Sequence, residues 1–86
     1  MPITVSFNDE KGRTATAGNK EALSIHDSGA CLLAKLSGEE KGGRVSFIER
    51  NQIDGNQTFP EIRVMVGESI SHRYMGVGVT ATVRGS

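Results

Sequence analysis

His26, Asp27 and Ser28 are consecutive in the chain, and they are the three residue types of a hydrolase triad. In a triad the nucleophile, the base and the orienting carboxylate converge from separate backbone segments. Three sequence neighbours cannot readily meet in that way, and the chain has no Gly-x-Ser-x-Gly motif that would expose Ser28. We interpret these residues as a turn held by local hydrogen bonds, and we expect no catalytic residue.

Cys31 is the second candidate nucleophile, with His26 or His72 as its base. It lies in the apolar run 30–34, where a cysteine usually packs as a small hydrophobic residue. Two histidines and one cysteine are too few for a structural zinc site unless carboxylates complete it. We therefore expect Cys31 in or near the core, no metal, no cofactor and no enzymatic activity.

Glycines gather in the tripeptides at 42–44 (GGR) and 76–78 (GVG). A phosphate-binding loop needs a following helix that begins with Lys-Ser or Lys-Thr, and neither tripeptide is followed by that pair. We interpret the first as the end of a loop and the second as a place where strands pack closely.

His72, Arg73 and Tyr74 bring a titratable group, a cation and an aromatic ring together before a strand. Arginine and tyrosine can stack on a base, and arginine can hold a phosphate. The alternative, which we favour, is an exposed hairpin end at which Tyr74 covers the edge of the core with its hydroxyl in water. Both interpretations leave these three residues as candidate contacts.

The charges of the chain are balanced, with 10 basic and 10 acidic residues whose signs alternate along the sequence. A protein that binds the nucleic-acid backbone usually carries a clear positive excess, because phosphate neutralisation supplies most of its affinity. We therefore expect no nucleic-acid partner, since composition gives no support to a basic face.

The chain of 86 residues predicts one small domain over 1–86 with a thin core, since only 36% of its residues are hydrophobic. So thin a core favours self-association or a protein partner. A lone cysteine excludes an intrachain disulfide, and the first residues do not resemble a signal peptide. The longest apolar run, 30–34, is far shorter than the roughly 20 residues that span a membrane. We expect a cytoplasmic protein without membrane insertion.

Alternation of apolar with polar or small residues, which is typical of β-strands, recurs along the chain. It is clearest over residues 75–84, and it also predicts strands at 3–7, 13–17, 44–50 and 62–66. These strands must position every candidate residue named above.

The segments between these strands carry turn-forming residues. We expect a turn at 8–12, an exposed loop at 37–43 and a hairpin connection at 51–57 around an Asp-Gly-Asn turn. Residues 67–72 are expected to form a connection with a short extended piece around Ile70.

Residues 20–36 allow two interpretations. We favour two strands joined at Asp27 and Ser28, and the alternative is a short helix capped by Asp27. The sequence thus predicts an all-β domain, a small antiparallel barrel or sandwich of six or seven strands with room for one short helix.

The stretch around this corner resembles the central signature of the PilZ-domain family. That signature is an Asp or Asn, a Ser two positions later and a Gly three further on, and the matching positions here are Ser24, His26 and Gly29. A looser likeness extends over residues 13–83 and includes the final aromatic, glycine and valine strand at 74–79. The resemblance implies a β-barrel signalling domain.

The departures from the family pattern bear on the ligand. Members that bind cyclic di-GMP use an Arg-x-x-x-Arg motif near the domain start, and here Arg13 stands alone before Ser24. Only Gly29 matches the signature residue for residue, because Ser24 and His26 replace the groups that read guanine. The resemblance therefore implies a divergent member that acts through protein contacts and does not bind cyclic dinucleotides.

These observations predict a non-enzymatic binding or adaptor module. Its expected working surface is the corner at 24–29 (Ser24, His26 and Gly29), with Arg13 and the group His72, Arg73 and Tyr74 as further contacts. One alternative is a self-assembling structural subunit, such as a viral or phage shell or tail component. Another is an oligonucleotide-binding barrel, which the balanced charge and the scarcity of aromatic rings disfavour.

Overall fold

The computed structural model describes residues 3–18, 22–39, 41–53 and 55–85, and within these ranges it contains nine β-strands and no helix. The all-β class predicted from the sequence is confirmed. The strands are β1 (Ile3–Asp9), β2 (Thr14–Gly18), β3 (Ala22–Asp27), β4 (Ala30–Glu39), β5 (Gly42–Asn51), β6 (Gly55–Thr58), β7 (Ile62–Met65), β8 (Ser69–Tyr74) and β9 (Val77–Gly85). None of the described residues forms a helix long and apolar enough to cross a membrane.

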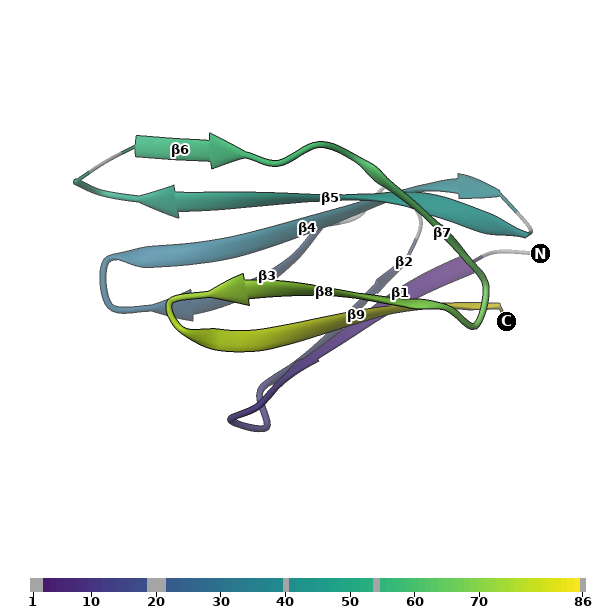
Figure 1. Cartoon of the computed structure of the whole chain (residues 1–86), viewed down its shortest axis with the longest axis horizontal. Coiled ribbons are helices and arrows are strands. Elements are labelled where there is room, and N and C mark those ends of the chain that lie inside the picture. The colour runs from purple at the N-terminus through teal and green to yellow at the C-terminus, as the bar shows by residue number, and fades with distance from the viewer. Residues whose placement is uncertain (1–2, 19–21, 40, 54, 86) are drawn as a thin grey trace.

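The strands form two antiparallel sheets that pack against each other (Figure 1). The four-stranded sheet has the order β2-β1-β9-β8, and the five-stranded sheet has the order β3-β4-β5-β6, with β7 also paired to β5. β6 and β7 are two halves of one edge strand, since β6 pairs with one end of β5 and β7 with the other. Pro60 lies in the break between them, and proline lacks the N–H that a ladder requires.

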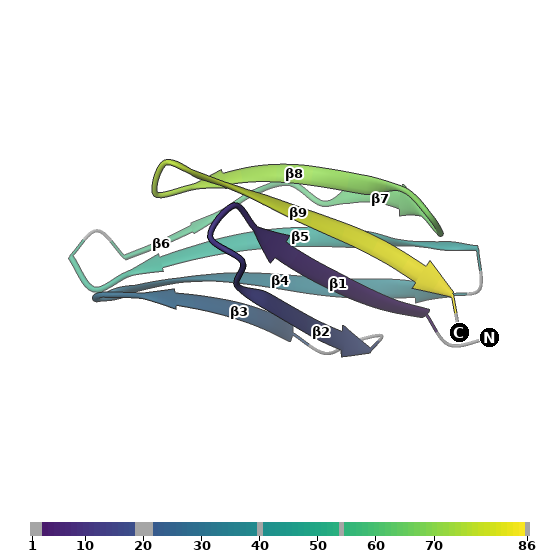
Figure 2. The ribbon, with the colours of Figure 1, turned by 90° about the horizontal axis from the view of Figure 1, so that it is seen from below.

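The chain winds as a meander that closes when β9 returns to pair with β1, so the two ends of the described chain lie side by side (Figure 1). Its ladders leave two seams between the sheets among the described strands. One lies between β2 and β3, and the other between β8 and the edge formed by β6 and β7 (Figure 2). The molecule is therefore a flattened barrel, or equally a sandwich with two narrow edges.

The core lies between the sheets and is filled by every second residue of the strands, as the alternation predicts. In β1, for example, Ile3, Val5 and Phe7 are buried, while the intervening Thr4 and Ser6 face outward. Most core residues are small, and the fully buried aromatic rings are those of Phe7, Phe47 and Tyr74. The core is therefore thin, as the composition predicts.

The predicted corner at Asp27 and Ser28 is confirmed, because β3 and β4 form a hairpin whose turn includes Ser28 and Gly29. The helix considered as an alternative for residues 20–36 does not occur in the described part of this segment. Gly29 has a φ of 70°, a conformation that glycine adopts without steric cost.

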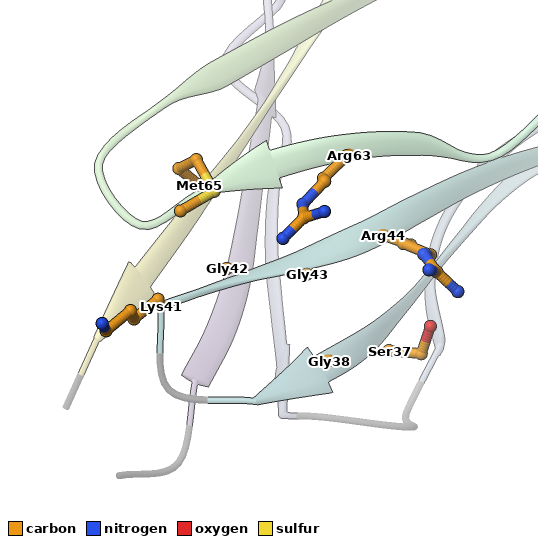
Figure 3. Close-up of a pocket in the computed structure, with 8 residues that line it drawn as sticks. All are labelled: Ser37, Gly38, Lys41, Gly42, Gly43, Arg44, Arg63 and Met65. Carbon is orange, nitrogen blue, oxygen red and sulfur yellow. The ribbon is translucent and has the colours of Figure 1, made fainter.

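The expected exposed loop at 37–43 is wrong, because β4 continues to Glu39 and β5 already begins at Gly42 (Figure 3). Gly38 and Gly43 are register partners in this hairpin. A Cβ on Gly38 would lie 2.5 Å from the carbonyl oxygen of Gly42 and from the Cα of Gly43. The glycines that suggested a loop instead let two backbones approach closely.

Three further expectations need correction. Residues 69–74 form strand β8 and not a connection, because they pair along their whole length with β9. The final strand begins at Val77, since Met75 lies in the preceding turn with a φ of 50°. The described residues form nine strands where six or seven were expected, largely because β8 and the short edge strand β6 were missed.

Candidate functional site

The predicted corner lies at one end of the five-stranded sheet. His26 is exposed there, and with Gly29, Cys31 and Arg50 it borders a shallow depression of about 340 Å³. The side chain of Ser24 lies outside the described part of the structure. Of the residues predicted for this corner, the structure thus brings His26 and Gly29 together.

Cys31, expected in or near the core, is half-buried and lies on the outer face of the sheet. Its register partners are His26 on β3 and Arg50 on β5. Side chains alternate between the two faces of β4, and the even-numbered Leu32 and Ala34 are the ones that point inward and are buried. The odd-numbered Cys31 therefore points outward. An apolar run cannot reveal this phase, because its residues are apolar at odd and even positions alike.

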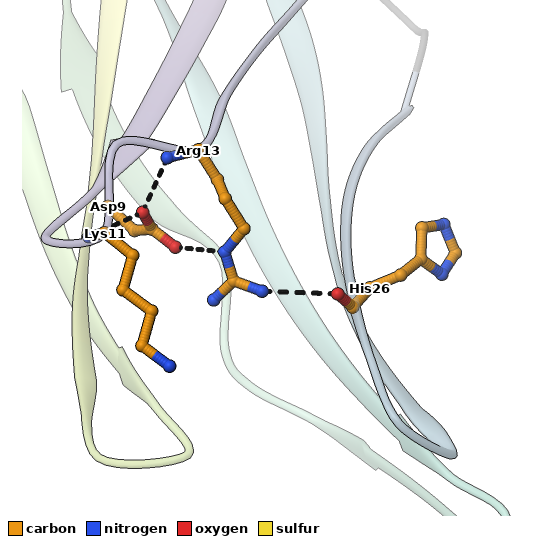
Figure 4. Close-up of polar contacts among 4 residues, drawn as sticks. All are labelled: Asp9, Lys11, Arg13 and His26. Atoms are coloured by element: carbon orange, nitrogen blue, oxygen red, sulfur yellow. Dashed lines mark hydrogen bonds and ion pairs between the residues drawn. The ribbon is translucent and has the colours of Figure 1, made fainter.

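Arg13 bridges the two sheets at the seam between β2 and β3. Its Nε donates to Oδ2 of the buried Asp9 at 2.6 Å, and its Nη1 donates to the carbonyl oxygen of His26 on β3 at 3.2 Å (Figure 4). Oδ1 of Asp9 also accepts hydrogen bonds from the backbone N–H groups of Lys11 and Arg13. The guanidinium therefore links the β1–β2 hairpin to the other sheet.

These contacts also act on the ionisation of Asp9. Burial by itself would raise the pKa of the Asp9 carboxyl. The backbone and side-chain hydrogen bonds from Arg13, its positive charge and the Lys11 N–H together outweigh that cost, and the pKa lies below its usual value. The carboxylate is thus bound as an anion within the fold.

His72 occupies the second seam. Its Nε2 lies 2.7 Å from Oε2 of Glu49 on β5, so the contact joins the two sheets. The imidazole stacks on Phe47, with ring centroids 4.6 Å apart and planes 14° apart, and it meets the ring of Phe59 edge-on. His72 is therefore enclosed by partners within the protein.

The three residues His72, Arg73 and Tyr74 do not form one surface. They lie in β8, where successive side chains point to opposite faces. Tyr74 is 2% exposed and belongs to the core, whereas Arg73 is exposed on the outer face of the four-stranded sheet. The predicted candidate contacts are thus divided among the core, both seams and both outer surfaces.

One outer face of the protein concentrates positive charge, which the sequence did not predict. The outer face of the five-stranded sheet carries four exposed cationic side chains, which we name the basic face: Lys35, Arg44, Arg50 and Arg63. Among the residues of these ladders whose side chains the structure describes, none that faces outward is acidic, and the backbone of Glu39, at the end of β4, pairs with Gly42. Of the described carboxylates, Asp9 is buried and Glu49 lies in a seam.

The balanced composition hides this asymmetry, because it sums over both sheets and the core. One signal was present in the sequence, since Arg44 and Arg50 share the phase of β5 opposite to that of the buried Val45 and Phe47. The phase places both arginines on one outer face of their own strand. It does not say that Lys35 and Arg63 lie beside them.

Comparisons of the chain with protein-family models, with curated proteins and with solved structures find no match. The resemblance to the PilZ family accordingly stays a prediction.

Proposed function

We propose that this protein is a non-enzymatic binding module that docks an acidic surface of a partner protein on its basic face. The observation that carries the proposal is the gathering of Lys35, Arg44, Arg50 and Arg63 on one sheet face of a chain with zero formal net charge. Complementary charge favours encounter with such a partner and excludes partners of like charge.

The other residues of this face favour a protein over a nucleic acid. Leu33 and Ile48 are half-buried between the cations, and Met65 is 38% exposed beside them. Arginine and methionine are enriched at protein interfaces, where apolar contact area supplements charge. Single-stranded nucleic acids are bound on exposed aromatic rings, and the described aromatic residues lie in the core or in the seam at His72.

The structural roles of the polar groups support a function without catalysis. Asp9 and Arg13 close one seam, and Glu49 and His72 close the other. His26 and Cys31 are register partners on an open sheet face. The departures from the PilZ signature further support an adaptor that does not use cyclic dinucleotides, and the lone cysteine agrees with a cytoplasmic location.

The test compares two charge-reversed variants by proximity labelling in the organism that encodes the chain. Arg44→Glu/Arg63→Glu alters the basic face, and the matched control Arg73→Glu/Arg84→Glu alters two exposed arginines of the other sheet. We expect an acidic partner to be labelled by the wild type and the control but not by the basic-face variant, and its binding to weaken as salt rises.

Circular dichroism must show that both variants remain folded. Equal labelling by the two variants would refute the proposal. Oligomers of the wild type that survive Arg44→Glu/Arg63→Glu, with no partner labelled, would favour the self-assembling structural subunit instead.

A further inference from the structure

One end of the basic face places two arginines directly opposite each other. Arg44 on β5 and Arg63 on β7 are register partners in an antiparallel ladder, and both side chains are exposed. Ser37 on β4 is the register partner of Arg44 on its other side. The three residues thus form one row across three strands of the outer face.

Two like charges directly opposite on neighbouring strands destabilise a sheet. A protein can offset this repulsion with a carboxylate, yet no described carboxylate forms an ion pair with Arg44 or Arg63. A bound anion would relieve the repulsion between these two exposed cations.

The same row borders a hollow that could hold such an anion. A depression of about 340 Å³ is lined by Ser37, Lys41, Arg44 and Arg63, together with glycines of the β4–β5 hairpin (Figure 3). Gly42 has no side chain to fill it, and a Cβ there would lie 2.9 Å from the carbonyl oxygen of Val64. Figure 3 shows the Arg63 side chain reaching from β7 toward the glycine segment of β5.

We propose that this depression binds a dianionic phosphate monoester, held by the guanidinium groups of Arg44 and Arg63 with Lys41 and the hydroxyl of Ser37 at its rim. A phosphate monoester carries a charge of about −1.5 to −2 and three strong acceptor oxygens. Two guanidinium groups can each donate a pair of parallel hydrogen bonds to such a group. A single carboxylate offers half the charge and fewer acceptors.

This inference rests on the proposed function if the phosphate belongs to a phosphorylated side chain of the partner protein. Inorganic phosphate and small phosphate esters present the same chemistry, so the experiment has to separate these sources. The probes are inorganic phosphate, a short glycine peptide with one phosphoserine, and the same peptide without phosphate.

The experiment records amide and arginine Nε chemical shifts of the isotope-labelled protein during titration with each probe at constant ionic strength. We expect saturable shifts confined to residues 37–44 and 62–65 with both phosphate probes, and none with the unphosphorylated peptide. Arg44→Gln/Arg63→Gln should weaken binding by about tenfold or more, whereas Arg73→Gln/Arg84→Gln on the other sheet should leave it unchanged.

A thermal melt gives a second readout. Arg63→Gln should raise the melting temperature in phosphate-free buffer, because it removes the repulsion, and should abolish the further rise that phosphate causes in the wild type. Tighter binding of the phosphopeptide than of inorganic phosphate would identify a phosphorylated partner as the source, and equal binding would identify the phosphate group alone.

Shifts that do not saturate, that spread over both sheets, or that persist in Arg44→Gln/Arg63→Gln would overturn the phosphate site. The proposed function is tested separately. If phosphate fails to bind but Arg44→Glu/Arg63→Glu still loses the acidic partner, the binding module stands and only the phosphate site falls.

Discussion

Replacing His72 by alanine tests whether the seam between β8 and β5 depends on this one side chain. The change removes the stacked contact with Phe47, at 4.6 Å between ring centroids, and such a pair contributes about 0.5–1.5 kcal/mol. It also removes the 2.7 Å hydrogen bond to Glu49, which adds roughly 1–2 kcal/mol. We expect His72→Ala to lower the free energy of unfolding by about 2–3 kcal/mol.

The neighbouring Arg73 supplies a matched control. It lies in the same strand but points outward, so Arg73→Ala should change the free energy of unfolding by less than about 0.5 kcal/mol. His72→Phe keeps the ring and loses only the hydrogen bond, and we expect an intermediate loss of about 1–2 kcal/mol.

The assay is urea denaturation followed by far-ultraviolet circular dichroism, with the slope of the transition compared among variants. An unchanged slope shows that the mutations act on stability and not on the extent of unfolding. Equal losses for His72→Ala and Arg73→Ala would refute the assignment of His72 to the seam. A loss in His72→Phe as large as in His72→Ala would refute the contribution of ring stacking.

Two further predictions concern a buried carboxylate and a strained turn. The Asp9 carboxylate has a folded-state pKa below its ordinary value of 3.8, so it stabilises the fold above that pH, and this contribution is lost as the pH falls through the folded-state value. Acid titration of stability should therefore be less steep in Asp9→Asn, and an identical pH profile would contradict the role of Arg13. Met75 has a φ of 50° in the β8–β9 turn and is 61% exposed. Asparagine adopts a positive φ at lower cost than methionine, so Met75→Asn should raise the free energy of unfolding by about 1 kcal/mol, measured by thermal melts. An unchanged or lower melting temperature would argue against strain at this turn.

Much of the secondary structure could be predicted because it follows from local patterns. Alternation over residues 75–84 predicted the final strand, and the turn residues Asp27 and Ser28 predicted the corner before β4. Strand β8 was predicted only as a short extended piece around Ile70, because Ile70 is the one strongly apolar residue among its inward positions. It is a strand because it pairs along its whole length with β9, which follows it after the turn at Met75 and Gly76.

The candidate site was less predictable than the fold. His26 and Gly29 could be placed at a corner, since a turn is a local event. The role of His72 could not be foreseen, because Phe47 and Glu49 lie more than twenty residues earlier in the chain and meet it only across the seam.

By itself, the sequence determined an all-β chain with a thin core, an overall charge of zero and a division of each strand into two faces. The tertiary structure decided which strands lie side by side and which of their faces look outward together. That choice turned a balanced composition into a basic face, because Arg44 and Arg63 become neighbours only when β5 pairs with β7. The alternation of side chains along a strand determines which face of that strand each residue occupies. Only the register and the order of the strands in the sheet determine which residues of other strands lie next to it.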